Sequence, residues 1–166
     1  MIITTKQGDT GLTRLYKGKQ VSKANLTIGL LGLVDETQAV LGMVKATVKK
    51  PAEIISFISE EQSHLYDLMS ELSGAKVFEA AAINEWVAKI EQEQQRLLKT
   101  ATISNKFVLP GQNPLEAWCH IARTKIRELE RSLVQYEEEY PAFKKYVPYL
   151  NRLSDVFFTL SQYFLR

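Results

Sequence analysis

Charged side chains cluster in the segment 107–131, which has the sequence FVLPGQNPLEAWCHIARTKIRELER. Arg123, Arg127 and Arg131 recur every four residues, which places them on one face of a helix. Glu130 lies beside them. Guanidinium groups bind phosphate oxygens in pairs, so this face predicts a site for a polyanion. The alternative is a solvated helix face with ion pairs among its own residues, which is the commoner role of such charges.

The first 23 residues are candidates for the other part of such a site. They hold closely spaced glycines together with hydroxyl and cationic side chains, and a glycine-rich loop of this kind can wrap a phosphate with backbone amides. The G-x-x-x-x-G-K-[ST] order of a Walker A loop is absent. A flexible basic N-terminal arm is the alternative. The residues concerned are Thr5, Lys6, Gly8, Thr10, Gly11, Thr13, Arg14 and Gly18.

Two acidic residues, Asp35 and Glu36, interrupt the apolar segment 30–42, LLGLVDETQAVLG. Burying an unpaired carboxylate costs on the order of several kcal/mol. A buried acid here would therefore need a cationic partner, for which Arg123 and Arg127 are candidates. The alternative is that both carboxylates face water.

Amphipathic helices must position these groups. Apolar residues recur every three or four positions through most of the chain, and nothing alternates with period two, so no strands are expected. Short connections between the helices favour an all-α, up-and-down five-helix bundle. The chain is expected to form one domain over 1–166, with a loop over 1–23 and a bundle over 25–166. The expected helices are 25–49, 51–74, 83–100, the segment after Gly111, and 150–164.

Composition indicates an ordinary soluble domain of 166 residues, with 45% hydrophobic and 24% charged residues. The net charge of +2 is too small to indicate a nucleic-acid partner or an acidic membrane surface. The single cysteine, Cys119, falls on the apolar stripe of its helix, which suits a core residue in a reducing cytosol. No signal peptide is recognised, and the longest uncharged run, 24–34, is shorter than a membrane span. A cytoplasmic location is expected.

A di-iron carboxylate site is a competing hypothesis for a helical bundle. Such a site uses Glu-x-x-His on two helices and one further Glu on each of two others. Glu61 and His64 supply one pair, whereas Glu116 and His120 are one residue too far apart. The spacing therefore disfavours this hypothesis.

Five segments resemble the PduO-type ATP:cob(I)alamin adenosyltransferases. They occur in the order of that family and with similar separations across nearly the whole chain. Each segment alone is a weak match, but five in order are specific. They are TKQGDTGLTRL (5–15), GLVDETQAVLG (32–42), FVLPG (107–111), HIARTKIRELER (120–131) and NRLSD (151–155).

The resemblance implies a homotrimer with active sites between subunits, ATP and cob(I)alamin as substrates, and Mg²⁺ as a cofactor. Asp35 and Arg123 match a salt bridge across the subunit interface, and Phe107 matches an aromatic residue that holds cobalamin without its lower axial ligand. Glu130 is a candidate Mg²⁺ ligand. A cobalamin reductase and an adenosylcobalamin-dependent enzyme are the implied partners. The implied ATP-binding residues are Thr5, Lys6, Gly8, Asp9, Gly11, Thr13, Arg14, Lys23, Arg127, Glu130 and Asn151.

The chain also departs from the family pattern. Glu128 stands where a second arginine is usual, which is expected to reverse a charge near the triphosphate. Thr10 replaces a lysine, Gln112 replaces a glycine, and Gln162 stands where an arginine is frequent. These departures leave open a second hypothesis, a non-catalytic relative that binds ATP or a corrinoid.

Overall fold

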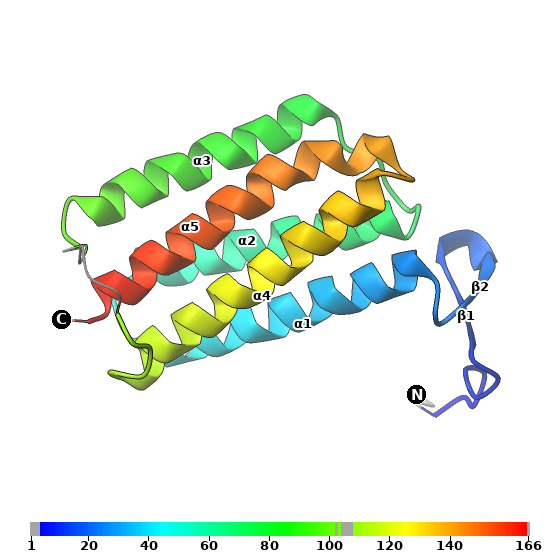
Figure 1. Cartoon of the computed structure of the whole chain (residues 1–166), viewed down its shortest axis with the longest axis horizontal. Coiled ribbons are helices and arrows are strands. Elements are labelled where there is room, and N and C mark those ends of the chain that lie inside the picture. The colour runs from blue at the N-terminus through cyan, green and yellow to red at the C-terminus, as the bar shows by residue number, and fades with distance from the viewer. Residues whose placement is uncertain (1–3, 102, 104–107, 166) are drawn as a thin grey trace.

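Five long helices form the bundle in the computed structural model, which describes residues 4–101, 103 and 108–165. Figure 1 shows the helices lying side by side along the long axis of the molecule. Helix α1 packs against α2 and α4, α4 packs against α5, and α5 packs against α3. The all-α prediction is confirmed. The helices are α1 (Leu26–Thr47), α2 (Ala52–Leu72), α3 (Ala80–Leu98), α4 (Pro114–Glu137) and α5 (Val147–Tyr163), the last preceded by a 3₁₀ segment, Pro141–Tyr146.

The expectation of no strands is wrong for the N-terminal segment. Strands β1 (Leu12–Arg14) and β2 (Gln20–Ser22) pair antiparallel, with Thr13 opposite Val21. A 3₁₀ turn, Tyr16–Gly18, joins them, and Gly18 adopts a φ of 80°, which a glycine accepts without steric cost. Each strand has only three residues, which is too short for an alternating pattern to be visible in the sequence.

The core is formed by the apolar stripes of the five helices. On α4 the predicted stripe is buried at Cys119, Ala122, Ile126 and Leu129 and continues to Tyr136. Burial raises the pKa of the Cys119 thiol well above its ordinary value, and Glu116 adds to the shift. The thiol is therefore protonated and inert, as expected for a core cysteine.

Side-chain caps define where two of the helices begin. Asn25 accepts a hydrogen bond from the Thr27 amide at 2.9 Å at the start of α1, and Asn113 accepts one from the Glu116 amide at 2.9 Å at the start of α4. The hydroxyls of Thr27 and Tyr136 lie 3.0 Å apart and join the start of α1 to the end of α4. Helices α1 and α4 are therefore antiparallel neighbours.

This arrangement separates the two ends of the molecule (Figure 1). The N-terminal segment with β1 and β2 extends from the end where α1 begins and α4 finishes. The turn at Pro110 and Gly111 lies at the opposite end, where α4 begins. A helix of 24 residues is about 36 Å long, so the length of α4 separates these two regions within one subunit.

Among the helices in the described residues, α1 alone is long and apolar enough to be a candidate membrane span, with a mean hydropathy of 1.3. It also carries Asp35, Glu36 and Lys45. Its apolar side chains, including Val34, Leu41 and Val44, are buried in the bundle core. Core packing therefore accounts for part of its apolar composition, while Leu26 and Met43 are exposed.

Candidate functional site

Part of the N-terminal segment encloses a polar groove of about 500 Å³. Four of the predicted ATP-binding residues line it: Thr5, Gly8, Thr13 and Arg14. Gln7, Leu12 and Gln20 complete the lining and were not singled out from the sequence. Residues 12 and 14 lie on β1 and residue 20 on β2, so the hairpin that the sequence did not predict is the element that builds this groove.

Tight turns bring the remaining loop residues close together. The amide of Asp9 donates to the carbonyl of Lys6 at 3.3 Å, and that of Gly11 donates to the carbonyl of Gly8 at 3.2 Å. Lys6 and Gly11 have positive φ values of 58° and 77°. The amide of Lys23 donates to the carbonyl of Gly11 at 2.9 Å, so the start of the bundle holds this loop.

The ammonium of Lys23 lies directly over Gly8. A Cβ atom added at Gly8 would come within 2.8 Å of Lys23 Nζ, which is closer than van der Waals contact allows. The absence of a side chain at position 8 therefore lets the cation reach the loop backbone, which is a suitable place to meet a phosphate.

On α4, the predicted residue Glu130 contacts Asn151 of α5, and Arg127 lies three residues earlier on the same helix. The Nδ2 atom of Asn151 donates to Glu130 Oε1 at 3.0 Å, and Arg152 Nη1 donates to Asn151 Oδ1 at 2.8 Å. Arg152 is held in turn by Glu91 of α3, with Nε and Oε1 3.0 Å apart. Arg127 is exposed, and no ion pair to it appears among the described residues. Its guanidinium is available for an anion.

Sequence analysis did not identify the role of Arg152. Arg152 fixes the side-chain amide of Asn151, so that the amide oxygen points to Arg152 and the NH₂ group points to Glu130. The position of Arg152 directly after Asn151 gives no signal of this, because adjacent helix residues do not face each other in a regular way.

Asp35 and Arg123 do not meet within one subunit. Asp35 is exposed on α1 and forms no ion pair within the described part of the chain. Its neighbour Glu36, also exposed, pairs with Lys125 at 2.8 Å rather than with an arginine. Within the described part of one subunit, both acids are therefore exposed and neither is paired with an arginine. The predicted pairing of Asp35 with Arg123 across a subunit interface stays a prediction.

Glu128 is engaged in the same local cluster. Lys125 Nζ lies 3.0 Å from Glu128 Oε2 as well as 2.8 Å from Glu36 Oε1. These two carboxylates raise the pKa of Lys125. The acid that replaces the usual arginine thus has a cationic partner on its own helix.

A second, mostly apolar pocket of about 320 Å³ lies where α4 begins. Phe107, the predicted cobalamin contact, lies outside the described residues. The turn that follows it is described, and the carboxylate of Glu116 holds it by accepting the amides of Gly111 at 2.8 Å and Gln112 at 3.1 Å. The pocket is lined by Pro110, Gly111, Ala117, His120, Ile121, Arg123 and Thr124.

The two Glu–His pairs of the di-iron hypothesis serve other contacts. Glu61 is buried, accepts from Tyr149 at 2.9 Å and lies 3.4 Å from His64, whose ring stacks on Trp86 with centroids 4.2 Å apart. Burial raises the pKa of the Glu61 carboxyl, although His64 and Tyr149 oppose the shift. Within 4–101, 103 and 108–165, no group of three or more His, Cys, Asp and Glu residues could hold a metal ion.

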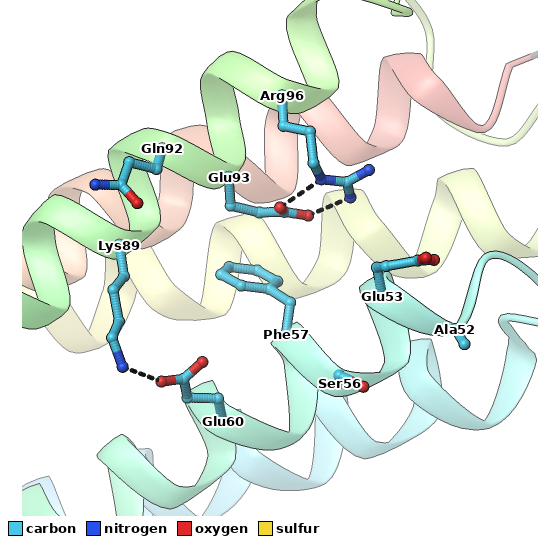
Figure 2. Close-up of a pocket in the computed structure, with 9 residues that line it drawn as sticks. All are labelled: Ala52, Glu53, Ser56, Phe57, Glu60, Lys89, Gln92, Glu93 and Arg96. Carbon is cyan, nitrogen blue, oxygen red and sulfur yellow. Dashed lines mark hydrogen bonds and ion pairs between the residues drawn. The ribbon is translucent and has the colours of Figure 1, made fainter.

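The groove in Figure 2, of about 550 Å³, lies between α2 and α3 and contains no predicted site residue. Its cations are already paired: Lys89 donates to Glu60 at 2.7 Å, and Arg96 Nε donates to Glu93 at 2.7 Å. Phe57 lies between the two pairs. Glu53, which also lines the groove, has no ion pair among the described residues, so the groove offers no unpaired cation for an anionic ligand.

Comparisons with known proteins agree with the motif order. The family model described as Cobalamin adenosyltransferase matches residues 3–164. The chain is 33% identical to a cobalamin adenosyltransferase of Cupriavidus metallidurans, covering 96% of this chain and 86% of the relative. It is 32% identical to a corrinoid adenosyltransferase of Mycobacterium leprae, covering 96% and 89%. A solved PduO-type ATP:corrinoid adenosyltransferase from Lactobacillus reuteri, a variant complexed with cobalamin and ATP, superimposes with a TM-score of 0.87 at 26% identity, covering 99% of this chain and 91% of the other.

Proposed function

Because this chain belongs to the cobalamin adenosyltransferase family, we propose that it transfers the 5′-deoxyadenosyl group of ATP to the cobalt of reduced cob(I)alamin. The products are adenosylcobalamin and triphosphate. The observation that carries the proposal is the match to the family model over residues 3–164. This range includes both the N-terminal groove and the polar face of α4.

ATP is assigned to the N-terminal loop and to the α4 face that carries Arg127. Backbone amides, hydroxyls and cations of the loop suit a triphosphate, and an exposed guanidinium adds a bidentate contact. The Glu130–Asn151 pair at 3.0 Å supplies a carboxylate and an amide at the same face. The loop residues of the proposed site are Thr5, Lys6, Gly8, Asp9, Gly11, Thr13, Arg14 and Lys23.

Mg²⁺ fits this donor set. The ion is usually held by phosphate oxygens and one or two carboxylates rather than by a complete protein cage, and Glu130 supplies one carboxylate. When bound with ATP, the ion neutralises charge on the phosphates. The residues of this chain then hold the nucleotide and fix its orientation.

The reaction needs no protein base. The cobalt of cob(I)alamin supplies the electron pair that forms the cobalt–carbon bond at the 5′ carbon, and the bond from that carbon to the triphosphate oxygen breaks. Triphosphate leaves with the electron pair of that bond. The protein must align the two substrates, exclude water and stabilise the leaving charge, which is the task of Arg127 and the loop cations.

A homotrimer is the proposed assembly, with each site built between subunits. The length of α4 separates the nucleotide loop from the Pro110 turn in one subunit, so a site that uses both regions needs two copies of the chain. Asp35, exposed on α1, is the proposed partner of Arg123 in the neighbouring subunit. Phe107 is assigned to the lower face of the corrin, where an apolar side chain excludes a water ligand.

The cellular setting is proposed from the chemistry. Cob(I)alamin must be produced by a reductase, and adenosylcobalamin must be passed to an enzyme that uses it as a cofactor. Both partners, and the single buried cysteine, suit the cytoplasm.

The direct test is to mix the protein with Mg-ATP and chemically reduced cobalamin and to follow the light-sensitive adenosylated product. Formation of product together with stoichiometric triphosphate is the expected result. A well-folded protein that binds ATP by calorimetry yet forms no product would instead be the non-catalytic relative.

A further inference from the structure

Glu116 stands at the N-terminal end of the row of polar residues on α4 that continues through His120, Arg123 and Arg127. These positions are separated by four, three and four residues, so they share one face of the helix. Glu116 is completely buried, with 0% of the residue exposed. Full burial of a glutamate is uncommon and requires compensating contacts.

One carboxylate oxygen of Glu116 makes those contacts with the turn before the helix. Glu116 Oε2 accepts from the amides of Gly111 at 2.8 Å and Gln112 at 3.1 Å. Gly111 has a φ of 110°, a conformation that glycine adopts readily and few other residues adopt, and the two hydrogen bonds to Glu116 hold the turn in it. A capping glutamate at this helix position normally reaches only the N-cap amide; here it reaches two residues that precede the cap.

The other oxygen, Glu116 Oε1, lies 3.0 Å from His120 Nε2, but the angles do not form a hydrogen bond, and neither atom has a hydrogen-bond partner among the described residues. His120 is buried, and burial lowers its pKa, with a further lowering from Arg123 and an opposing effect of Glu116. One carboxylate therefore touches both the turn and the imidazole.

Both groups next to the Glu116 carboxylate form walls of the pocket of about 320 Å³ at the start of α4. Pro110 and Gly111 come from the turn, and His120 comes from the helix. The rest of the lining is mostly apolar, and Arg123 is its one cation. A triphosphate needs several cations, whereas the edge of a corrin ring presents apolar surface and amide side chains, so this pocket suits the corrinoid.

We propose that Glu116 is a positioning residue for the corrinoid: its buried carboxylate fixes the turn 110–112 as one wall of the pocket that receives one edge of the corrin, and it lies against the His120 ring that forms another wall. This inference rests on the proposed function and deepens it by assigning that pocket to the second substrate. Glu116 touches neither substrate in this arrangement.

Three variants separate acceptor geometry from charge. Glu116→Gln keeps a side-chain oxygen of the same reach for the two amides, Glu116→Asp keeps the charge but is one methylene shorter, and Glu116→Ala removes both. Kinetic constants are measured with chemically reduced cobalamin and with Mg-ATP, and ATP affinity is measured by calorimetry. Glu85→Ala, an exposed glutamate on α3, is the matched control.

The expected result is a corrinoid KM raised about tenfold or more in Glu116→Ala and Glu116→Asp, the size of one lost charge-assisted hydrogen bond. Glu116→Gln should restore the corrinoid KM to within about threefold of the parent, since a carbonyl oxygen still accepts from the turn. ATP affinity should be unchanged in all three variants, which a general loss of folding would not produce.

Two outcomes would overturn the inference while leaving the proposed function intact: an unchanged corrinoid KM in folded Glu116→Ala, or equal losses for ATP and corrinoid. If Glu116→Ala does not fold, Glu116→Gln and Glu116→Asp decide, because the inference requires Gln to perform better than Asp and fails if it does not. If the parent protein itself shows no turnover, the proposed function is rejected, and that result does not depend on the variants.

Discussion

The side-chain amide of Asn151 donates to Glu130 Oε1 across 3.0 Å and so connects α5 to the polar face of α4. Arg152 fixes the orientation of that amide from the opposite side, at 2.8 Å. The contact unites two candidate ATP-binding residues that are 21 positions apart in the chain.

Asn151→Ala should weaken Mg-ATP binding about tenfold, close to 1.4 kcal/mol, because the Glu130 carboxylate loses the donor that orients it. Calorimetric titration with Mg-ATP measures the effect. Asn84→Ala, at an exposed position on α3, should bind like the parent. Equal affinity in Asn151→Ala and Asn84→Ala would remove the α5 contact from the site.

Arg127→Ala should weaken ATP binding by about 1.5–3 kcal/mol, the usual range for a lost hydrogen bond to a charged group. Arg127 is exposed on its helix, so the free energy of unfolding should change little. Arg96→Ala on α3 removes an equally basic residue far from the loop and serves as the control. If both variants titrate ATP like the parent, Arg127 is not a ligand.

Gly8→Ala should weaken ATP binding by about threefold, a modest loss for a displaced charged contact. The added Cβ would lie 2.8 Å from Lys23 Nζ, so the end of the lysine must move away from the loop. Gly32→Ala in α1 is the control, because a Cβ there meets nothing within 4 Å. The prediction fails if Gly8→Ala binds ATP as tightly as Gly32→Ala.

Glu128→Gln should leave ATP affinity within about twofold of the parent, because a partly exposed acid that already has a cationic neighbour exerts little long-range effect. The lysine partner, Lys125, also pairs with Glu36. If the chain were the non-catalytic relative, restoring the family arginine by Glu128→Arg would be expected to raise activity. The observed pairing predicts no gain, since the new cation would face Lys125. A clear gain in activity for Glu128→Arg would show that residue 128 acts on the triphosphate.

Glu61→Gln should stabilise the fold progressively as pH rises above the ordinary range of a glutamate. Burial raises the pKa of Glu61 in the folded state, so the native state favours the protonated carboxyl. The stability that the protonated Glu61 contributes in the parent is therefore lost as pH rises through that raised pKa. Glutamine cannot ionise and still accepts from Tyr149. The free energy of unfolding in urea, compared for parent and variant at about pH 5.5 and about pH 7.5, measures the difference. A difference that shrinks with rising pH would contradict this assignment.

Helix positions and core residues were predictable because their signals are local. The stripe through Cys119, Ala122 and Ile126 repeats every three or four residues, and the same spacing placed Arg127 and Glu130 together on another face. The helix starts at Leu26 and Pro114 follow asparagine caps. Patterns of this kind predict all five helices without any information on how the helices pack against one another.

Contacts that depend on distant or flexible groups were not predictable in the same way. Lys125 has a long side chain that can reach several acids, and its pairing with Glu36 and Glu128 could not be predicted from the sequence. The β1–β2 hairpin rests on three pairs of residues whose register is set by a 3₁₀ turn. Glu116 was weighed as a metal ligand, whereas it holds the turn before its own helix.

The chain has one cysteine, Cys119, which lies in the N-terminal half of α4 with its thiol buried in the core. A thiol reagent added to native protein can reach Cys119 only when that part of the bundle opens. The rate of its modification therefore records how often the N-terminal half of α4 separates from the core, without any engineered label.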